Sequence, residues 1–195
     1  MKKFLCIATL ILAASLSGQA QSLKYIGNVE ADFGFGFTVK LKPFDAYNYG
    51  RLFFGGGIST MHGIEFNERL TLGAGAGAGI VSIDEKLVGP MEYTRAYYSL
   101  FVHADYAFRQ PTEKLRPYAA ARIGFFQVVN CGWLLGARFG VGGGLRINNR
   151  WDVGLWFNTG YCPYYDWIED EHGDSKNVFT PALPIIPHIS AAYRF

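Results

Sequence analysis

Two pairs of residues have types and spacing that could support catalysis. His103 and Asp105 are two residues apart, so in a strand they would face the same side and could form a histidine–carboxylate pair for general-base chemistry. His188 and Ser190 share this spacing and could form a nucleophile and its base. No acidic residue follows Ser190 to orient that histidine. We expect a structural role for both pairs and no enzymatic activity.

Charged residues recur on one side of segments in which every second residue is apolar. The set comprises Glu30, Asp32, Glu65, His103, Asp105, Arg122, Arg138, Arg146, Asp152 and Arg194. If these side chains share one narrow space, the acids and arginines must pair, because an unpaired buried charge is very costly. The arginine fork suits such pairing. We therefore predict a charge network, with no catalytic residue, no metal site and no cofactor.

The elements that would position this set are β-strands. Residues 25–39 alternate between apolar and polar or small residues, over a length that exceeds the usual soluble strand of about five or six residues. A strand that crosses a membrane needs about 9–11 residues. The pattern recurs in seven further segments, at 51–66, 70–80, 98–108, 119–125, 135–146, 151–158 and 189–195. In one of them His62 falls on the apolar side, so we expect a β-bulge there.

The connections between these segments alternate in length. Short turns are expected at 67–68, 110–115 and 148–149, and longer polar connections at 41–50, 84–95, 127–134 and 163–183. An even number of strands with this alternation predicts an all-β fold, an eight-stranded antiparallel up-and-down transmembrane β-barrel. A soluble barrel is the alternative, but its exposed face should be rich in Lys and Glu. Here that face carries Gly, Ser and Asn with single charges.

Composition agrees with a membrane barrel. Aromatic residues make up 16% of the chain and charged residues only 17%, with 24 glycines in 195 residues, whereas soluble domains average about 25% charged residues and about 7% glycine. After the N-terminal stretch, no apolar run reaches the roughly 18 residues of a membrane-spanning helix. Glycines at 73, 75, 77, 79, 140, 142 and 144 would make room for long lumen side chains. The lumen could then be plugged or could hold a thin conducting path.

The N-terminus has the features of a secretory signal peptide. Met1 to Lys3 is basic, Phe4 to Leu16 is apolar, and Gly18 to Ala20 supplies small residues for cleavage. We expect residues 1–20 to be the signal peptide and residues 21–195 to be the barrel. An uncleaved anchor is the alternative. The leader holds two of the 18 basic residues and none of the 16 acids, so the remainder is neutral and no nucleic-acid partner is expected.

The last strand carries the most specific family signal. The segment 189–195 alternates and ends with Tyr193 and Phe195, and the segment 61–67 is typical of the second hairpin of porin-like domains. The chain therefore resembles the bacterial outer-membrane protein β-barrel family, the small OmpA/OmpX-like group. Ser190 stands where such strands often have glycine. The resemblance implies location in the cell outer membrane, contact with its lipid, and recognition of Tyr193 and Phe195 by the barrel-assembly machinery.

Two features fall on the predicted outer connections. Cys131 and Cys162 would lie near the outer rim, where an exported protein can form a disulfide, although two free thiols are the alternative. The last connection is rich in acids and aromatics, which could bind an extracellular partner or a divalent ion or could simply be solvated. These residues are Tyr164, Tyr165, Asp166, Trp167, Glu169, Asp170, Glu171 and Asp174.

Three functions are consistent with this pattern. The first is an integral outer-membrane barrel with a largely side-chain-filled lumen and a structural, adhesive or loop-mediated recognition role. The second is a narrow porin-like channel for ions or small solutes. An envelope enzyme is the third and has the least support, because barrels of one architecture differ in function and the pairs above lack the remaining catalytic groups.

Overall fold

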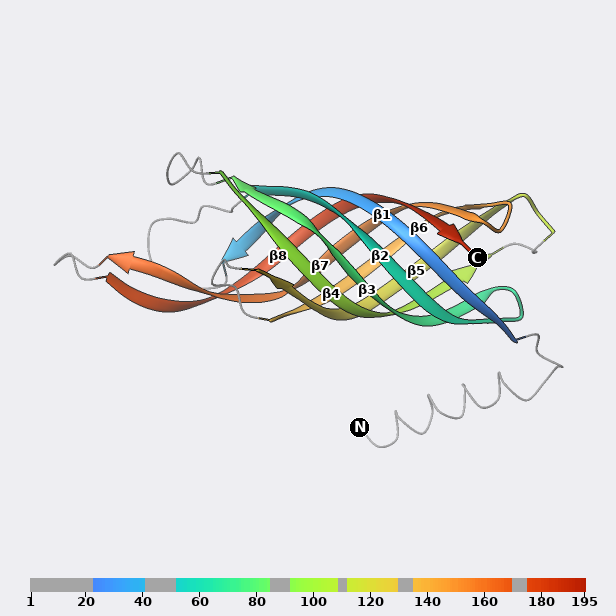
Figure 1. Ribbon diagram of the computed structural model, residues 1–195, viewed down its shortest axis with the longest axis horizontal. Helices are drawn as coiled ribbons and strands as arrows, with labels where there is room; N and C mark the ends of the chain where they lie inside the picture. The colour runs from blue at the N-terminus through green and yellow to red at the C-terminus, as the bar shows by residue number, and fades with distance from the viewer. Residues whose placement is uncertain (1–22, 41–51, 85–91, 109–111, 130–134, 170–174) are drawn as a thin grey trace, which may run out of the picture.

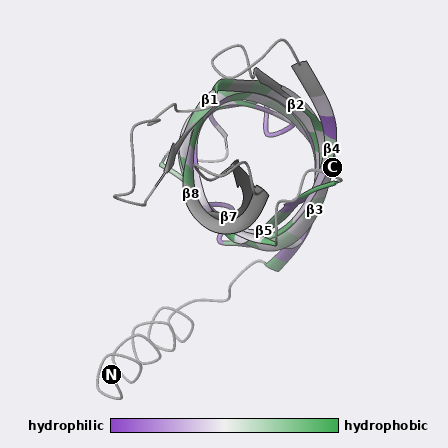
Figure 2. Ribbon diagram, turned by 90° about the vertical axis from the view of Figure 1, so that its left-hand side faces the viewer, coloured by the Kyte–Doolittle hydropathy of each residue, from purple (hydrophilic) through white to green (hydrophobic). Residues whose placement is uncertain are grey.

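The computed structural model describes residues 23–40, 52–84, 92–108, 112–129, 135–169 and 175–195. They form eight strands: β1 (Leu23–Lys40), β2 (Leu52–Phe66), β3 (Leu70–Asp84), β4 (Glu92–Ala107), β5 (Leu115–Val128), β6 (Gly136–Ile147), β7 (Trp151–Glu169) and β8 (Ser175–Arg194). Each strand pairs antiparallel with the next, and β8 pairs with β1 to close the barrel (Figure 1). The end-on view shows the closed ring (Figure 2).

No helix in the described parts of the chain is long and apolar enough to span a membrane.

Burial in this barrel is the reverse of burial in a soluble one. Along β7, Trp156 and Asn158 point inward and are 1% and 3% exposed, whereas Phe157 between them is 61% exposed. Large apolar side chains cover the outer surface on every strand, and the buried residues include many charged ones. A closed sheet with an apolar exterior and a polar interior satisfies its backbone internally and is suited to hydrocarbon rather than water. The prediction of an eight-stranded transmembrane β-barrel is confirmed.

The two ends of the barrel differ, as predicted. At one end, β2 and β3 are joined by a tight turn in which the Arg69 N–H donates to the Phe66 carbonyl oxygen at 3.1 Å. Its two central residues, Asn67 and Glu68, have φ of 50° and 56°, the left-handed conformation of a two-residue hairpin turn. The β6–β7 turn repeats this geometry at 148–149. We call this the turn end and the opposite end the loop end; short turns are periplasmic in such barrels.

The predicted bulge in β2 is wrong. Its register with β1 and with β3 is unbroken from Leu52 to Phe66, so His62 lies on the lipid-facing side. The histidine is accommodated because Tyr25 O–H lies 2.5 Å from its Nδ1 and Thr60 Oγ1 lies 3.1 Å from its Nε2. The Thr60 hydroxyl in turn donates to the Asn28 carbonyl oxygen at 3.0 Å. A complete hydrogen-bond chain, rather than a bulge, makes a polar residue tolerable there.

The prediction that 163–183 is a connection is also wrong. β7 and β8 stay paired from Pro163↔Pro181 to Glu169↔Ser175. In this part the two strands project together beyond the loop end of the barrel (Figure 1). We call residues 163–169 and 175–181 the β7–β8 ribbon. The sequence concealed it because prolines usually argue against a strand, yet they are tolerated where no neighbour needs their missing N–H. In the described chain, the ribbon pairs with no other strand.

The C-terminal residue forms part of the seam that closes the barrel. Phe195 exchanges two backbone hydrogen bonds with Gly27, at 3.0 and 2.9 Å. Its ring lies directly over Gly27, where a Cβ would meet ring carbons of Phe195. Tyr193 and Trp151 are in edge contact at the same end, with ring centroids 5.1 Å apart. Tyr193 and Phe195 thus face outward in an aromatic band near the turn end.

Candidate functional site in the barrel lumen

An ion pair spans the lumen from one side of the barrel to the other. Arg122 on β5 donates from both terminal nitrogens to the Glu30 carboxylate on β1, at 2.7 and 2.6 Å. These strands are four apart in a ring of eight, so the pair crosses the full width of the barrel. Arg122 Nε also donates to His103 Nδ1 at 3.0 Å, and His103 Nε2 bonds Asp105 at 3.1 Å.

A second group of ion pairs lies closer to the turn end and shares Asp105 with the first. Arg146 donates from Nε to Asp152 at 2.9 Å and from Nη2 to Asp105 at 2.8 Å. Arg194 donates to Glu65 at 2.8 Å, and its Nη1 lies 3.9 Å from Asp152. Because Asp105 bonds both His103 and Arg146, the two groups form one continuous network.

Eight of the ten predicted lumen residues belong to this network, which we call the plug. Its members are Glu30, Glu65, His103, Asp105, Arg122, Arg146, Asp152 and Arg194. Aromatic rings fill the remaining space around it: the Arg122 guanidinium carbon lies 4.0 Å from the centroid of Trp156 and 5.0 Å from that of Phe101. All eight residues are buried. The arginines and carboxylates of the plug are therefore paired with each other away from bulk solvent.

Arg116 is a lumen residue that the sequence analysis missed. It is 2% exposed and donates to the Asn149 side-chain oxygen at 2.8 Å and to the Glu68 carbonyl oxygen. It thereby connects the β6–β7 turn with the β2–β3 turn across the turn end. Its place in the alternation, six residues before Arg122, could have revealed it. The predicted strand began too late, at residue 119, to include it.

The lumen glycines provide the room predicted for large side chains. A Cβ on Gly142 would lie 2.5 Å from the Trp156 ring, and one on Gly75 would lie 2.6 Å from the Phe101 ring. Both distances are far shorter than any van der Waals contact. At these positions the absence of a side chain is therefore required by the ring of a neighbouring strand.

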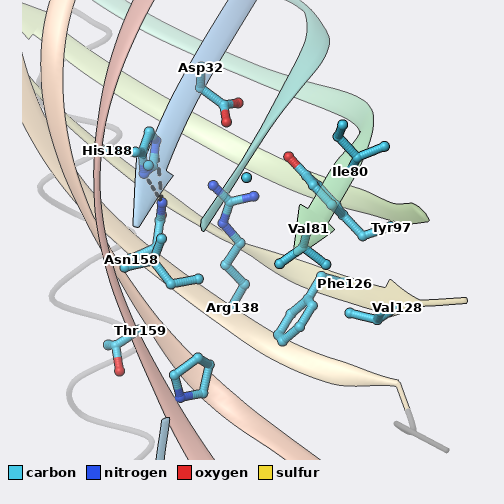
Figure 3. Close-up of a pocket in the computed structure, with 14 residues that line it drawn as sticks. Asp32, Ile80, Val81, Tyr97, Phe126, Val128, Arg138, Asn158, Thr159 and His188 are labelled. Atoms are coloured by element: carbon cyan, nitrogen blue, oxygen red, sulfur yellow. Dashed lines mark hydrogen bonds between the residues drawn. The ribbon is translucent and has the colours of Figure 1, made fainter. Parts of the chain in front are cut away.

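Asp32 and Arg138, the other two predicted residues, lie apart from the plug in the loop half of the lumen. They line a hollow together with Tyr97, Asn158 and His188 (Figure 3). Asn158 Nδ2 bonds His188 Nδ1 at 2.7 Å. Apolar lumen-facing side chains, which we call the collar, complete the wall: Val81, Phe126, Val128, Pro184 and Ile186. The collar was not predicted from the sequence, because the expected lumen was polar throughout.

Both histidine pairs considered from the sequence are hydrogen-bonded to other lumen residues. Both ring nitrogens of His103 are engaged by Arg122 and Asp105. Ser190 accepts a hydrogen bond from Trp156 Nε1 at 3.1 Å, while His188 bonds Asn158. In the described residues no hydrogen bond joins His188 to Ser190, and no cluster of ligating side chains could hold a metal ion.

Some predictions fall where the structure does not describe the chain. The signal peptide, Cys131 and the acidic residues 170, 171 and 174 lie outside the described residues. The backbone of Cys162 lies in β7, but its side chain and those of the ribbon are not described. The proposed disulfide and the loop site therefore stay predictions.

Comparisons with known proteins give structural neighbours only. No family model matches the chain, and no curated protein matches it. Among solved structures, Neisserial surface protein A is 15% identical with a TM-score of 0.44 and covers 87% of this chain and 97% of its own. OprG from Pseudomonas aeruginosa is 13% identical with a TM-score of 0.44 and covers 87% of this chain and 96% of its own. The outer membrane enzyme PagL is 14% identical with a TM-score of 0.43 and covers 83% of this chain and 97% of its own.

These likenesses carry no argument about activity, since barrels with and without enzymatic names occur among them. The location of the protein follows from its own architecture. A closed eight-stranded antiparallel sheet with an apolar outer surface places this chain among the integral outer-membrane β-barrels, in agreement with its resemblance to the small OmpA/OmpX-like group.

Proposed function

We propose that this protein is a non-conducting, non-enzymatic barrel of the outer membrane that has a structural, adhesive or recognition role at the cell surface. The observation that carries the proposal is the cross-lumen pair between Arg122 and Glu30. An eight-stranded barrel is only just wide enough for side chains to fill. An ion pair that spans its width, with neighbours packed on both sides, leaves no continuous path for a solute.

The energetics of the plug support a permanent rather than a movable barrier. Arg146 is 1% exposed and contacts carboxylates on both β4 and β7. Separating one of these pairs would leave an uncompensated buried charge, at a cost of about 3–5 kcal/mol. Opening the lumen would require several such separations at once.

The loop end is where such a barrel would meet a partner. The β7–β8 ribbon extends seven register pairs past the last pair that belongs to the barrel wall, Cys162↔Ala182. Strands without neighbours offer free backbone donors and acceptors, which can pair with an extended segment of another protein. A barrel that needed the ribbon only for closure would end it at the rim.

The remaining partners follow from the position of the barrel in the membrane. The apolar outer surface would contact outer-membrane lipid, and Tyr193 and Phe195 on the last strand would be recognised by the barrel-assembly machinery, as the family resemblance implies. The signal peptide would direct export and be removed.

The alternative is a narrow porin-like channel. The hollow in the loop half favours it, because part of the lumen is open there. Liposome swelling tests both proposals. Vesicles that hold the refolded protein should swell no faster than empty ones in glycine or arabinose, with a general porin as the positive control. Swelling above the empty-vesicle rate would favour the channel.

A further inference from the structure

The hollow in the loop half of the lumen contains an acid and an arginine that form no ion pair with each other. In the close-up, the Arg138 guanidinium and the Asp32 carboxylate point toward the same space, and the Tyr97 hydroxyl also points into it (Figure 3). Within the described chain, no ion pair or hydrogen bond joins Arg138 to Asp32, and Arg138 Nε is buried without a partner. This contrasts with the plug, where the arginines are paired with acids.

A second polar group in the hollow is also incompletely bonded. Asn158 is 3% exposed, and while its Nδ2 bonds His188, its Oδ1 has no hydrogen-bond partner in the described residues. Unsatisfied buried polar atoms are uncommon and are costly unless water or a ligand satisfies them. Arg138 Nε and Asn158 Oδ1 both belong to side chains that line this hollow, where a bound molecule could satisfy them.

The collar defines the rest of that occupant. Val128 and Pro184 are buried, and Phe126 and Ile186 are part-buried, on the lumen side of β5 and β8. An apolar wall beside a few convergent polar groups is the usual form of a small-molecule site. The cavity volume of the hollow is about 90 Å³. Its wall favours an occupant with an apolar body.

We propose that this hollow binds small organic acids that carry a hydrogen-bond donor near the carboxylate and a short apolar tail. The ligand carboxylate pairs with Arg138, whose planar fork recognises carboxylates. The donor, a hydroxyl on the carbon chain, bonds Asp32. The tail lies against the collar.

This arrangement explains why Asp32 and Arg138 can remain apart. An acid without the donor would bring a carboxylate toward Asp32, and Arg138 alone would have to offset the repulsion between the like charges. The donor converts that contact into a hydrogen bond to a charged acceptor. The pair therefore selects hydroxy acids over plain acids of the same length.

The test uses 3-hydroxyhexanoate, hexanoate and 1-hexanol with the refolded protein in lipid nanodiscs. Saturation-transfer NMR measures binding, and empty nanodiscs correct for partition into lipid. We expect saturable binding of 3-hydroxyhexanoate that is at least tenfold tighter than binding of the other two, since bonds to charged groups contribute about that factor or more. Equal affinities for the three compounds, or no saturable binding of 3-hydroxyhexanoate, to the wild-type protein would overturn the proposal.

Two variants assign the groups. Arg138→Gln should weaken 3-hydroxyhexanoate binding at least tenfold, and Asp32→Asn should reduce the preference for 3-hydroxyhexanoate over hexanoate. Arg150→Gln, in the exposed β6–β7 turn at the opposite end, is the matched control and should leave binding unchanged. Resistance to SDS before heating verifies that each variant is folded. Unchanged binding in folded Arg138→Gln protein would contradict the proposal, whatever the result of the swelling assay.

Discussion

Arg122 and Glu30 are separated by 92 residues in the chain, yet their side chains form two hydrogen bonds of 2.7 and 2.6 Å across the barrel lumen. Both residues are buried, and the Trp156 ring packs against the guanidinium. The pair therefore fixes β1 and β5 relative to each other from inside the barrel. The proposal of a closed lumen depends on this pair.

Removing the cation of this pair should destabilise the barrel strongly. Arg122→Met leaves the Glu30 carboxylate buried and uncompensated, and we expect the free energy of unfolding to fall by about 3–5 kcal/mol. The double variant Arg122→Met with Glu30→Gln should recover a large part of this loss. Urea unfolding in lipid vesicles, followed by tryptophan fluorescence, measures both. If the free energy of unfolding of Arg122→Met lies within 1 kcal/mol of the wild-type value, the pair does not stabilise the barrel as proposed.

The lumen glycines should be intolerant of even one added carbon where a ring lies over them. Gly142→Ala forces the Trp156 ring to move, and we expect a loss of about 1–3 kcal/mol from overpacking. Gly143→Ala is a matched control, because a Cβ at either position meets a carbonyl oxygen at 2.8 Å but only Gly142 faces the ring. The same unfolding assay compares them. Equal losses would refute the space-filling role.

The lipid-facing histidine should depend on its tyrosine. Tyr25→Phe removes the hydroxyl that lies 2.5 Å from His62 Nδ1, and an unsatisfied polar atom facing lipid should cost about 1–2 kcal/mol. Adding His62→Leu should restore stability, because no polar ring then needs a partner. A double-mutant cycle by urea unfolding in vesicles gives the coupling. A coupling near zero would contradict the hydrogen-bond chain.

The β7–β8 ribbon should be dispensable for folding. Deleting residues 164–180 and joining the ends with a Gly-Gly turn leaves every described pairing with β6 and β1 in place. The shortened protein should still resist SDS until it is heated, as the wild type should. Loss of that resistance would mean that the ribbon holds the barrel together, and its proposed recognition role would lose its basis.

Alternation along the chain predicted the eight-stranded fold and the inward face of most strands. Asp152 and Leu155, three residues apart on β7, lie inside and outside as their positions required. The pattern also concealed features. Prolines hid the ribbon, and a strand predicted to begin too late hid Arg116.

Partners across the lumen could not be predicted in this way. Whether Arg122 meets Glu30 or Asp32 depends on the stagger of β1 against β5, which is set by the summed register of all strands between them. The alternation predicts which face of a strand a residue lies on, but it does not predict how far one strand is displaced along another. The separation of Asp32 and Arg138 from the plug was unpredictable for the same reason.

The most direct test of the central claim, a lumen closed by paired side chains, is single-channel recording of the refolded wild-type protein in planar lipid bilayers. The closed lumen predicts a baseline without steady unit currents at either polarity, at a protein density where a porin control conducts. Steady unit currents that scale with the amount of folded, SDS-resistant barrel would contradict it.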